Sequence, residues 1–398
     1  MLSAAALGLL PLVQPAPAGA DTPPTPLGVV SQTDPGDAEF AVMGAGGVRA
    51  YRWLISWPAL QPRAGVEPDW TETDRIVASL AEHRITALPF VSGSPCFAVD
   101  CAREPPSRVH RQPPVGSARG KLEWARFLSQ LVDRYGSDGS FWSANPSLPR
   151  TPITAWQIWN EQNALRNFAP LPSVTRYAEL LAIAAQTIRS RDPKASIVLG
   201  GMFGDPRGRG AIDASRFLSR LYAVPGAERS FDVVAVHPYA PTAAEVGRLV
   251  EGVRRVMDTH GDSRTALWVT ELGWGASASD EGRLVKTVHG QARMLRGAFR
   301  LLLAERVELR LAGLLWFAWR DTPPGESVCG WCGTAGLFDA AGTARPAWRA
   351  FTKLSGGTSS PLTSGDDQGA AGSVPWLLLA IPVALALTGL WMLYRRRR

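Results

Sequence analysis

The sequence predicts an α/β fold, a single (β/α)8 TIM barrel, and three observations support this. Short apolar runs rich in β-branched residues alternate with longer amphipathic segments between Leu27 and Leu354, which is typical of parallel strands joined by helices. Eight such runs occur, a number that fits a closed barrel better than an open doubly wound sheet. With 398 residues, 45% of them hydrophobic and 19% charged, the chain can also bury one large core.

The predicted strands and helices follow from these runs in chain order. The expected strands are residues 27–30, 48–56, 85–91, 153–159, 196–201, 231–237, 266–271 and 311–319. The expected helices are residues 74–82, 122–135, 174–189, 214–222, 243–260, 283–305 and 346–354. The first crossover, residues 35–47, is rich in glycine and predicts no clear helix.

Segments outside the barrel predict a secreted and tethered domain. Residues 1–20 are uncharged, contain an apolar run and end in "APAGA", which indicates a signal peptide, although they lack a basic n-region and a disordered Ala/Pro leader is the alternative. Residues 374–394 carry no charge and can cross a bilayer core of about 30 Å, a buried core helix being the alternative. The arginines at 395–398 then lie in the cytoplasm, and the Gly/Ser-rich residues 356–373 form a flexible linker. We therefore expect a single-pass protein of the cell membrane whose domain at 21–355 is extracellular.

The net charge gives no indication of a polyanionic partner. The formal charge is +7, and the four terminal arginines account for four of these seven charges. The remaining charge is small and no basic-aromatic array accompanies it, so the sequence predicts no nucleic-acid partner. Nothing in the sequence requires a metal ion or an organic cofactor, and the oligomeric state is not predicted.

The four cysteines fall into two close pairs, Cys96 with Cys101 and Cys329 with Cys332. In an extracellular protein each pair is expected to close a small disulfide loop. A zinc site built from both pairs is an alternative, but the pairs are far apart in the chain and lack histidines at ligand spacing. A redox role for "CGWC" is a weaker alternative, because the segment does not begin a helix after a first strand.

Polar side chains gather where the predicted strands end. Barrel enzymes place their active sites at the C-terminal ends of the strands, where the following loops converge. The candidates, from the second, fourth, sixth, seventh and eighth strands in turn, are Arg52, Asn160 and Glu161, His237 and Tyr239, Glu271, and Trp316. Two carboxylates are therefore expected to face one cavity.

Two carboxyl groups that flank a glycosidic bond can cleave it. One protonates the departing oxygen, while the other attacks the anomeric carbon or activates water. Asn160, beside Glu161 at the end of the same strand, is placed to hydrogen-bond a sugar hydroxyl. The sequence therefore predicts a glycosidase that acts on a polysaccharide or glycoconjugate near the cell surface.

Four segments at these strand ends resemble sequences of one enzyme class. "WQIWNEQN" ends the fourth strand and "WVTELGWG" the seventh, "YRWLISWPALQPRAGVEPDW" covers residues 51–70, and "VAVHPYA" covers residues 234–240. Together they resemble clan A glycoside hydrolases, which are retaining enzymes on (β/α)8 barrels, and in particular members of families 39 and 5. The resemblance extends over most of residues 27–354.

The resemblance implies a role for each strand-end residue. The implied roles are general acid/base for Glu161, nucleophile for Glu271, sugar-hydroxyl contact for Asn160, surroundings of the nucleophile for Arg52 and Tyr239, a pocket position for His237, and a platform under the sugar ring for Trp316. The alternatives are a solvated or capping carboxylate for either glutamate, a structural ion pair for Arg52, a rim position for His237 and a core position for Trp316.

Physical reasoning supports this division between the glutamates. Arg52 and the Tyr239 hydroxyl are expected to keep Glu271 ionised by charge and hydrogen bonding. Aromatic surroundings that include Trp159 are expected to raise the pKa of Glu161 so that it can donate a proton.

The chain has 15 tryptophans, a high count for its length, and aromatic faces stack on the apolar faces of sugar rings. Most of them, with Trp53, Trp70 and Trp319 as examples, are expected to pack in the core. Trp57, Trp274 and Trp331 lie in predicted loops at the mouth and are predicted to be subsite platforms.

Two further functions remain open from sequence. A transglycosylase would use the same covalent intermediate, and a catalytically silent carbohydrate-binding or scaffolding barrel would keep the fold alone. Both glutamates are present together with Asn160 and Arg52, which favours the enzyme. A retaining mechanism predicts carboxyl groups about 5 to 5.5 Å apart. The long, Cys-bearing loop at residues 91–121 leaves the sugar, the linkage and endo or exo action open.

Overall fold

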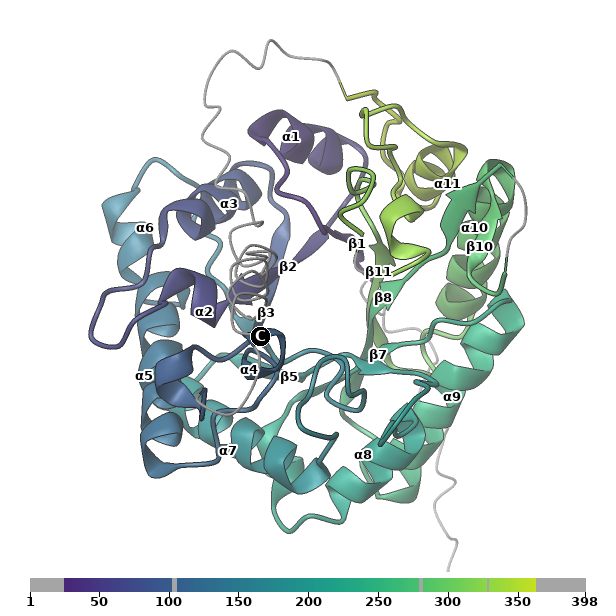
Figure 1. Cartoon of the computed structure of the whole chain (residues 1–398). Helices are drawn as coiled ribbons and strands as arrows, with labels where there is room; N and C mark the ends of the chain where they lie inside the picture. The colour runs from purple at the N-terminus through teal and green to yellow at the C-terminus, as the bar shows by residue number, and fades with distance from the viewer. Residues whose placement is uncertain (1–24, 102–105, 279–281, 328, 363–398) are drawn as a thin grey trace, which may run out of the picture. The chain divides into compact units, whose positions relative to one another are not determined.

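The computed structural model describes residues 25–101, 106–278, 282–327 and 329–362, and these residues form a closed barrel of parallel strands inside a ring of helices (Figure 1). The described strands are β1 (Leu27–Val30), β2 (Ala50–Ser56), β3 (Thr86–Ser92), β4 (Ala155–Ile158), β5 (Ser196–Leu199), β6 (Met202–Phe203), β7 (Val233–His237), β8 (Ala266–Leu272), β9 (Gly275–Ser277), β10 (Val285–Thr287) and β11 (Leu311–Phe317). Eight of these described strands form the ring in the order β5, β4, β3, β2, β1, β11, β8, β7, and pairing of β5 with β7 closes it. The predicted (β/α)8 fold is therefore confirmed.

Helices cover the outside of the barrel between consecutive strands. The described helices are α1 (Asp37–Ala45), α2 (Trp57–Leu60), α3 (Thr71–Glu82), α4 (Pro106–Val109), α5 (Ala118–Tyr135), α6 (Ser140–Ala144), α7 (Val174–Arg191), α8 (Ala214–Tyr222), α9 (Ala243–Thr259), α10 (Val288–Ala304) and α11 (Pro346–Ser355). Several start at the residues expected to cap a helix, since Ser117, Ser173 and Asp213 accept hydrogen bonds from backbone N–H groups in the first turns of α5, α7 and α8.

The first crossover forms helix α1, which the sequence did not clearly predict. Phe40 and Met43 are fully buried, and they stand three residues apart on one side of the helix. At the N-terminus the carboxylate of Glu39 accepts a hydrogen bond from the N–H of Gly36 at 2.9 Å. Burial of the apolar pair therefore outweighs the low helix propensity of the glycines.

The core has two layers, one inside the barrel and one between the barrel and the helices. Strand side chains alternate between them, so that Ala50 of β2 and Leu88 of β3 pack inside while Tyr51 and Val91 face the helices. The charged and polar side chains of the candidate site lie above the inner layer.

Both predicted disulfides are present, Cys96 with Cys101 and Cys329 with Cys332. Across residues 25–362, leaving out the gaps in the described ranges, no helix combines the length and apolarity that a membrane span needs. The predicted signal segment (1–20), membrane span (374–394) and basic tail (395–398) lie outside the described residues, as does most of the linker (356–373).

Candidate active site

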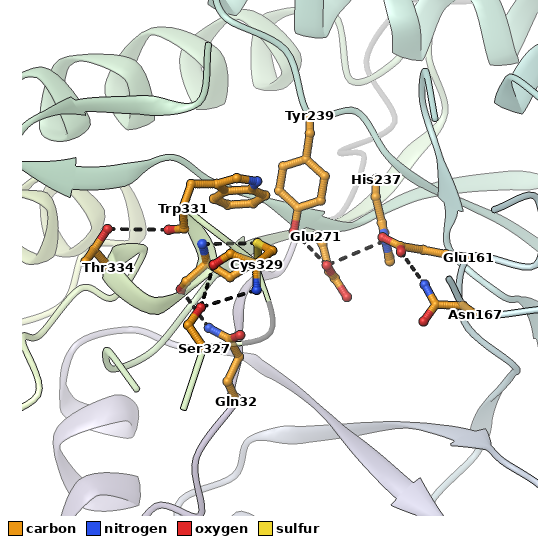
Figure 2. Close-up of a disulfide and its surroundings, with 11 residues drawn as sticks. Gln32, Glu161, Asn167, His237, Tyr239, Glu271, Ser327, Cys329, Trp331 and Thr334 are labelled. Atoms are coloured by element: carbon orange, nitrogen blue, oxygen red, sulfur yellow. Dashed lines mark hydrogen bonds and ion pairs between the residues drawn. A yellow bond between two sulfur atoms is a disulfide. The ribbon is translucent and has the colours of Figure 1, made fainter. Parts of the chain in front are cut away.

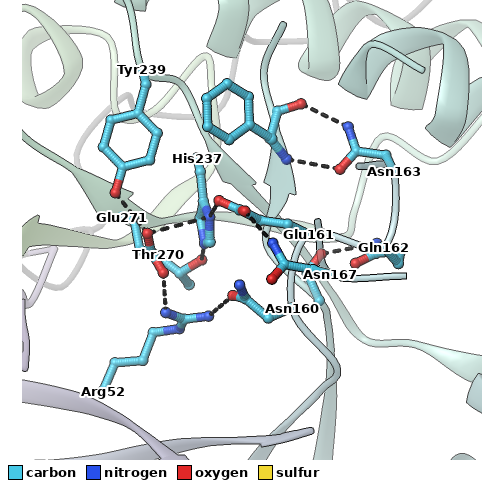
Figure 3. Close-up of polar contacts among 12 residues, drawn as sticks. Arg52, Asn160, Glu161, Gln162, Asn163, Asn167, His237, Tyr239, Thr270 and Glu271 are labelled. Carbon is cyan, nitrogen blue, oxygen red and sulfur yellow. Dashed lines mark hydrogen bonds and ion pairs between the residues drawn. The ribbon is translucent and has the colours of Figure 1, made fainter. Parts of the chain in front are cut away.

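The end of β4 places Asn160 and Glu161 in the mouth of the barrel. Trp159 and Glu161 have φ angles of 72° and 45°, in the left-handed region that non-glycine residues rarely adopt. Two backbone hydrogen bonds hold this turn, from Trp159 N–H to the Val91 carbonyl of β3 at 2.9 Å and from Glu161 N–H to the carbonyl of Gly201, between β5 and β6, at 3.1 Å. The turn directs the Asn160 amide toward Arg52 and the Glu161 carboxylate toward His237 (Figure 3).

An irregularity in β8 brings two adjacent polar residues into the same site. Val269 and Leu272 of β8 lie opposite Leu314 and Trp316 of β11, so three steps along β8 match two along β11. Such a bulge breaks the usual alternation of faces. Thr270 and Glu271 therefore both reach the polar network inside the barrel mouth, although they are consecutive (Figure 3).

Glu271 is held by two strong partners. Arg52 donates from Nη1 to Glu271 Oε1 at 2.6 Å, and the Tyr239 hydroxyl donates to Oε2 at 2.6 Å. The Arg52 side chain is fully buried and the Glu271 side chain is 9% exposed. Burial and the neighbouring Glu271 charge raise the pKa of Tyr239 well above its ordinary value, so its hydroxyl remains a donor. These contacts match the predicted surroundings of the nucleophile.

Arg52 also links Glu271 to Asn160. Its Nη2 donates to the Asn160 amide oxygen at 2.7 Å, and its Nε donates to the buried Gln157. The ring of Phe90 lies with its centroid 4.0 Å from the Arg52 guanidinium carbon. The guanidinium is thus fixed on all sides and in turn fixes the side chains from β4 and β8.

Glu161 lies in a different electrostatic environment. Burial raises its pKa to about 7, against the lowering effects of the Arg52 and Arg166 charges and of a hydrogen bond from Asn167. The Asn167 Nδ2 donates to Glu161 Oε2 at 2.5 Å. The Trp159 indole packs against Phe168 and donates to the carbonyl of Asn167, the residue that bonds Glu161. The pKa of Glu161 is thus raised in the predicted direction, with burial as the main cause.

His237 lies between the two glutamates. Its Nδ1 is 3.0 Å from Glu161 Oε1 and 3.6 Å from Glu271 Oε2, and its Nε2 is 3.0 Å from the Thr270 hydroxyl. Complete burial lowers the pKa of His237 to about 3, so the ring is neutral near neutral pH. A Cβ at Gly201 would come within 1.9 Å of the ring, so glycine is required there. The ring therefore supports Glu161 from the inside of the barrel.

The two carboxylates come close enough for joint chemistry. One oxygen of Glu161, one of Glu271 and a ring nitrogen of His237 all lie within 4.8 Å of one another. Three such ligands could hold a divalent cation. The Arg52 guanidinium at 2.6 Å from Glu271 already supplies positive charge to this cluster, so we derive no metal-dependent step.

The prediction that Trp316 forms a platform under the sugar ring is wrong by one position along the strand. Trp316 is fully buried and packs against Phe299 of α10, with its indole N–H donating to the Ala335 carbonyl. Its neighbour Phe317 is on the inner face of β11, where it contacts Tyr239 edge to face at a centroid distance of 6.1 Å. Phe317 is the residue that β11 brings to the mouth.

Two more predicted platforms also belong to the core. Trp57 is fully buried and stacks on Phe127 of α5 at 5.2 Å, while Trp274 is fully buried and its indole N–H donates to the Ala240 carbonyl. Apolar loop residues near a barrel mouth can face either the cavity or the surrounding helices, and the sequence does not distinguish these two cases.

Trp331 is the predicted platform that does lie at the mouth. It is partly exposed and contacts Tyr239 edge to face at 4.7 Å and Phe317 at 5.7 Å (Figure 2). The Cys329–Cys332 disulfide closes the short loop that carries it, and Gln32 donates to the Cys332 carbonyl at 2.9 Å. The tryptophan is therefore held in a small covalent ring beside Tyr239, the tyrosine that donates to Glu271.

Several residues of the site were missed by the sequence analysis. Phe203 packs on Tyr239 at a centroid distance of 5.5 Å, and its backbone N–H and carbonyl are both bonded by the Asn163 side chain. Asn167 could be suspected only from the polar run "WNEQN" that precedes it. Phe90 and Gln157 could have been found by extending the inner-face alternation of β3 and β4.

The fold is shared with solved glycoside hydrolases. A family 39 glycoside hydrolase from Bacteroides cellulosilyticus WH2 matches over 83% of this chain and 64% of its own, with 17% sequence identity and a TM-score of 0.61. A monomeric β-xylosidase from Caulobacter crescentus CB15 matches over 83% of this chain and 67% of its own, with 18% identity and a TM-score of 0.58. An exo-β-1,4-mannosidase from Opitutaceae bacterium strain TAV5 also matches over 83% of this chain and 59% of its own, with 15% identity and a TM-score of 0.56. The chain spans about two thirds or less of the length of these proteins.

Neither a protein-family model nor a curated protein matches the sequence. At such low identity, the structural matches show that the chain has the barrel fold of clan A glycoside hydrolases, as the sequence resemblance implied.

Proposed function

We propose that the barrel is a retaining glycoside hydrolase in which Glu161 is the general acid/base and Glu271 is the nucleophile. One observation carries the proposal: an oxygen of Glu161 lies within 4.8 Å of an oxygen of Glu271. Retaining enzymes place the two carboxyl groups about 5 to 5.5 Å apart, whereas inverting enzymes need about 6.5 to 9.5 Å to admit a water. A closest approach of this size favours the narrower, retaining arrangement over the wider one that an inverting enzyme needs.

In the first step, Glu271 attacks the anomeric carbon while Glu161 gives its proton to the departing oxygen. A pKa of about 7 keeps a large part of Glu161 protonated near neutral pH. Arg52 and Tyr239 fix the Glu271 carboxylate through one hydrogen bond to each oxygen. The nucleophile is therefore oriented before the sugar arrives, which reduces the reorganisation required in the transition state.

In the second step, Glu161 acts as a base on the water that hydrolyses the glycosyl-enzyme. Once Glu271 is esterified it carries no charge, so Arg52 is no longer neutralised by it. The Arg52 charge already lowers the pKa of Glu161, and this effect grows in the intermediate. The same residue is thus an acid in the first step and a base in the second.

The mouth offers a polar and an aromatic side to the sugar. Asn160, oriented by Arg52, is placed to bind the hydroxyl next to the reacting carbon. Tyr239, Phe317 and Trp331 form a contiguous aromatic cluster on the other side of the nucleophile. Aromatic surfaces of this kind suit the C–H face of a sugar ring, and a polysaccharide or glycoconjugate is the substrate we propose.

We place this activity outside the cell, on a domain tethered by residues 374–394. The two disulfides support an oxidising compartment, because such bonds are rare in the cytosol. Protease treatment of intact cells should digest the barrel while the basic tail remains protected; a barrel that resists digestion until the cells are lysed would contradict this location.

The enzyme assay uses the full-length chain in mild detergent with aryl glycosides and cell-envelope and plant polysaccharides. Glu161→Gln and Glu271→Gln should each reduce turnover at least about a thousandfold, while the matched control Glu251→Gln on α9 leaves it unchanged. Unchanged turnover in either active-site variant would remove that residue from the mechanism. NMR of the first sugar released should show the anomer of the substrate, and the opposite anomer would contradict a nucleophilic role for Glu271.

A further inference from the structure

Leu54 is a large apolar side chain that is 43% exposed although it lies in a barrel strand. Residues two apart in a strand share a face, so Leu54 lies on the inner face of β2 together with Arg52. Arg52 is fully buried at the base of the site, and Leu54 is one step closer to the mouth. Its exposed surface therefore faces the cavity in which the carboxylates lie.

Phe90 extends this apolar surface onto the neighbouring strand. Leu54 lies opposite Phe90 in the register of β2 and β3, and Phe90 is also partly exposed. The next pair toward the mouth is Ser56 opposite Ser92. Leu54 and Phe90, which we term the apolar wall, thus lie between the guanidinium of Arg52 below and two serine residues above.

The contacts of Arg52 locate the apolar wall relative to the substrate. Arg52 donates to Glu271 through Nη1 and to Asn160 through Nη2, and the Phe90 ring lies over the same guanidinium. A sugar bound with its anomeric carbon at Glu271 and the adjacent hydroxyl at Asn160 would lie beside Arg52 and could turn its remaining edge toward the wall. Neither Leu54 nor Phe90 has a side-chain donor or acceptor for a hydroxyl on that edge.

We propose that the apolar wall selects a sugar that carries a methyl group at this edge, as a 6-deoxyhexose does, and discriminates against the corresponding hydroxymethyl sugar. A methyl group covered by Leu54 and Phe90 gains from removal of apolar surface from water. A hydroxyl buried there without a partner loses its hydrogen bonds to water. This inference rests on the proposed glycosidase activity and specifies its substrate class.

The test compares matched pairs of aryl glycosides with the full-length chain. Each pair has the same anomer and ring configuration, such as β-D-fucoside with β-D-galactoside and α-L-rhamnoside with α-L-mannoside, and a β-D-xyloside with β-D-glucoside pair adds the pentose case. In the pairs that are cleaved, kcat/KM for the deoxy member should exceed that of its partner about tenfold or more, the range that one methyl group reaches in an apolar pocket.

Leu54→Asn, which is similar in size but polar, should reduce that ratio about tenfold, and Phe90→Tyr should reduce it in the same direction. Leu122→Asn, at a 51% exposed leucine on helix α5, is the matched control and should leave the ratio unchanged. A general loss of folding would lower both members of a pair and not their ratio.

Three results overturn the inference while leaving the glycosidase intact. These are a hydroxymethyl sugar cleaved as well as its deoxy partner, a ratio unchanged in Leu54→Asn, or a pentoside preferred over every methyl-bearing sugar. A preference for pentosides would mean that Leu54 and Phe90 sterically exclude any substituent on this edge of the sugar instead of binding a methyl group. If no glycoside or polysaccharide is cleaved in a manner that depends on Glu271, the proposed function itself fails, and the inference fails with it.

Discussion

Removal of the Asn167 side chain is expected to move the alkaline limb of the activity profile to higher pH. Asn167 donates to Glu161 Oε2 at 2.5 Å and stabilises the ionised carboxylate, which lowers a pKa that burial raises to about 7. Glu161 must be protonated to act as the acid, so activity falls as pH rises through this pKa. Without the Asn167 donor the ionised form is less stable, the pKa rises and the acid persists at higher pH.

The size of the shift follows from the strength of this hydrogen bond in the two states of Glu161. A hydrogen bond to a charged acceptor contributes roughly 1.5–3 kcal/mol and one to a neutral acceptor about 1 kcal/mol, so their difference is about 1 kcal/mol. One pKa unit corresponds to about 1.4 kcal/mol, so Asn167→Ala should raise the alkaline limb by about 0.7 unit. Asn167→Asp also adds a negative charge and should raise it further.

The assay is kcat/KM between pH 4 and 10 for an aryl glycoside whose phenol is a poor leaving group, so that departure needs the acid, with wild type and both variants. Asn145→Ala is the matched control, because the Asn145 side chain, which follows α6, also donates to one acceptor, the Phe141 carbonyl in the first turn of that helix, but far from the mouth. An alkaline limb that stays in place or moves to lower pH in Asn167→Ala would refute the reasoning. Glu161→Gln should lose the alkaline limb altogether, since no group remains to titrate.

Three further predictions concern neighbours of the same site. Tyr239→Phe removes the hydroxyl that bonds the nucleophile at 2.6 Å and should lower kcat about 10- to 100-fold with little change in melting temperature, so an unchanged kcat would contradict its role. The double substitution Cys329→Ser and Cys332→Ser opens the disulfide ring that holds Trp331 and should raise KM several-fold while kcat is retained. Michaelis–Menten measurements on the variant and wild type test this. Burial raises the pKa of Glu161 from 4.5 to about 7, so the stability that this carboxyl contributes is complete below pH 4.5 and is lost as the pH rises through 7. Glu161→Gln should therefore have a higher melting temperature than wild type at pH 9 but not at pH 5. Equal differences in melting temperature at the two pH values would contradict this.

The strand pattern and the strand-end residues could be predicted because they depend on local regularities. Apolar runs with turn signals between them gave eight strands, and the barrel brings Arg52, Glu161 and Glu271 together once their strands are correctly ordered. Trp316 shows where this reasoning fails. Strand side chains alternate with period two, so an error of one position selects the residue that faces the helices instead of Phe317.

Other features depend on departures from regular structure that a single sequence does not reveal. The bulge that turns both Thr270 and Glu271 inward appears only in the pairing of β8 with β11. The left-handed turn at Trp159 and Glu161 is imposed by contacts with Val91 of β3 and with Gly201 between β5 and β6. Long-range packing therefore fixes the orientations, while the sequence pattern indicates which residues are available.

The roles of the two glutamates can be argued from their surroundings alone. Glu271 accepts hydrogen bonds from a buried cation and a tyrosine, one to each oxygen, which suits a carboxylate that must be ionised and aligned. Glu161 has a neutral imidazole and a carboxamide as its neighbours, and burial raises its pKa to about 7. Two carboxylates in one cavity with environments this different support the proposed division into a nucleophile and an acid, and this argument does not depend on any resemblance to other enzymes.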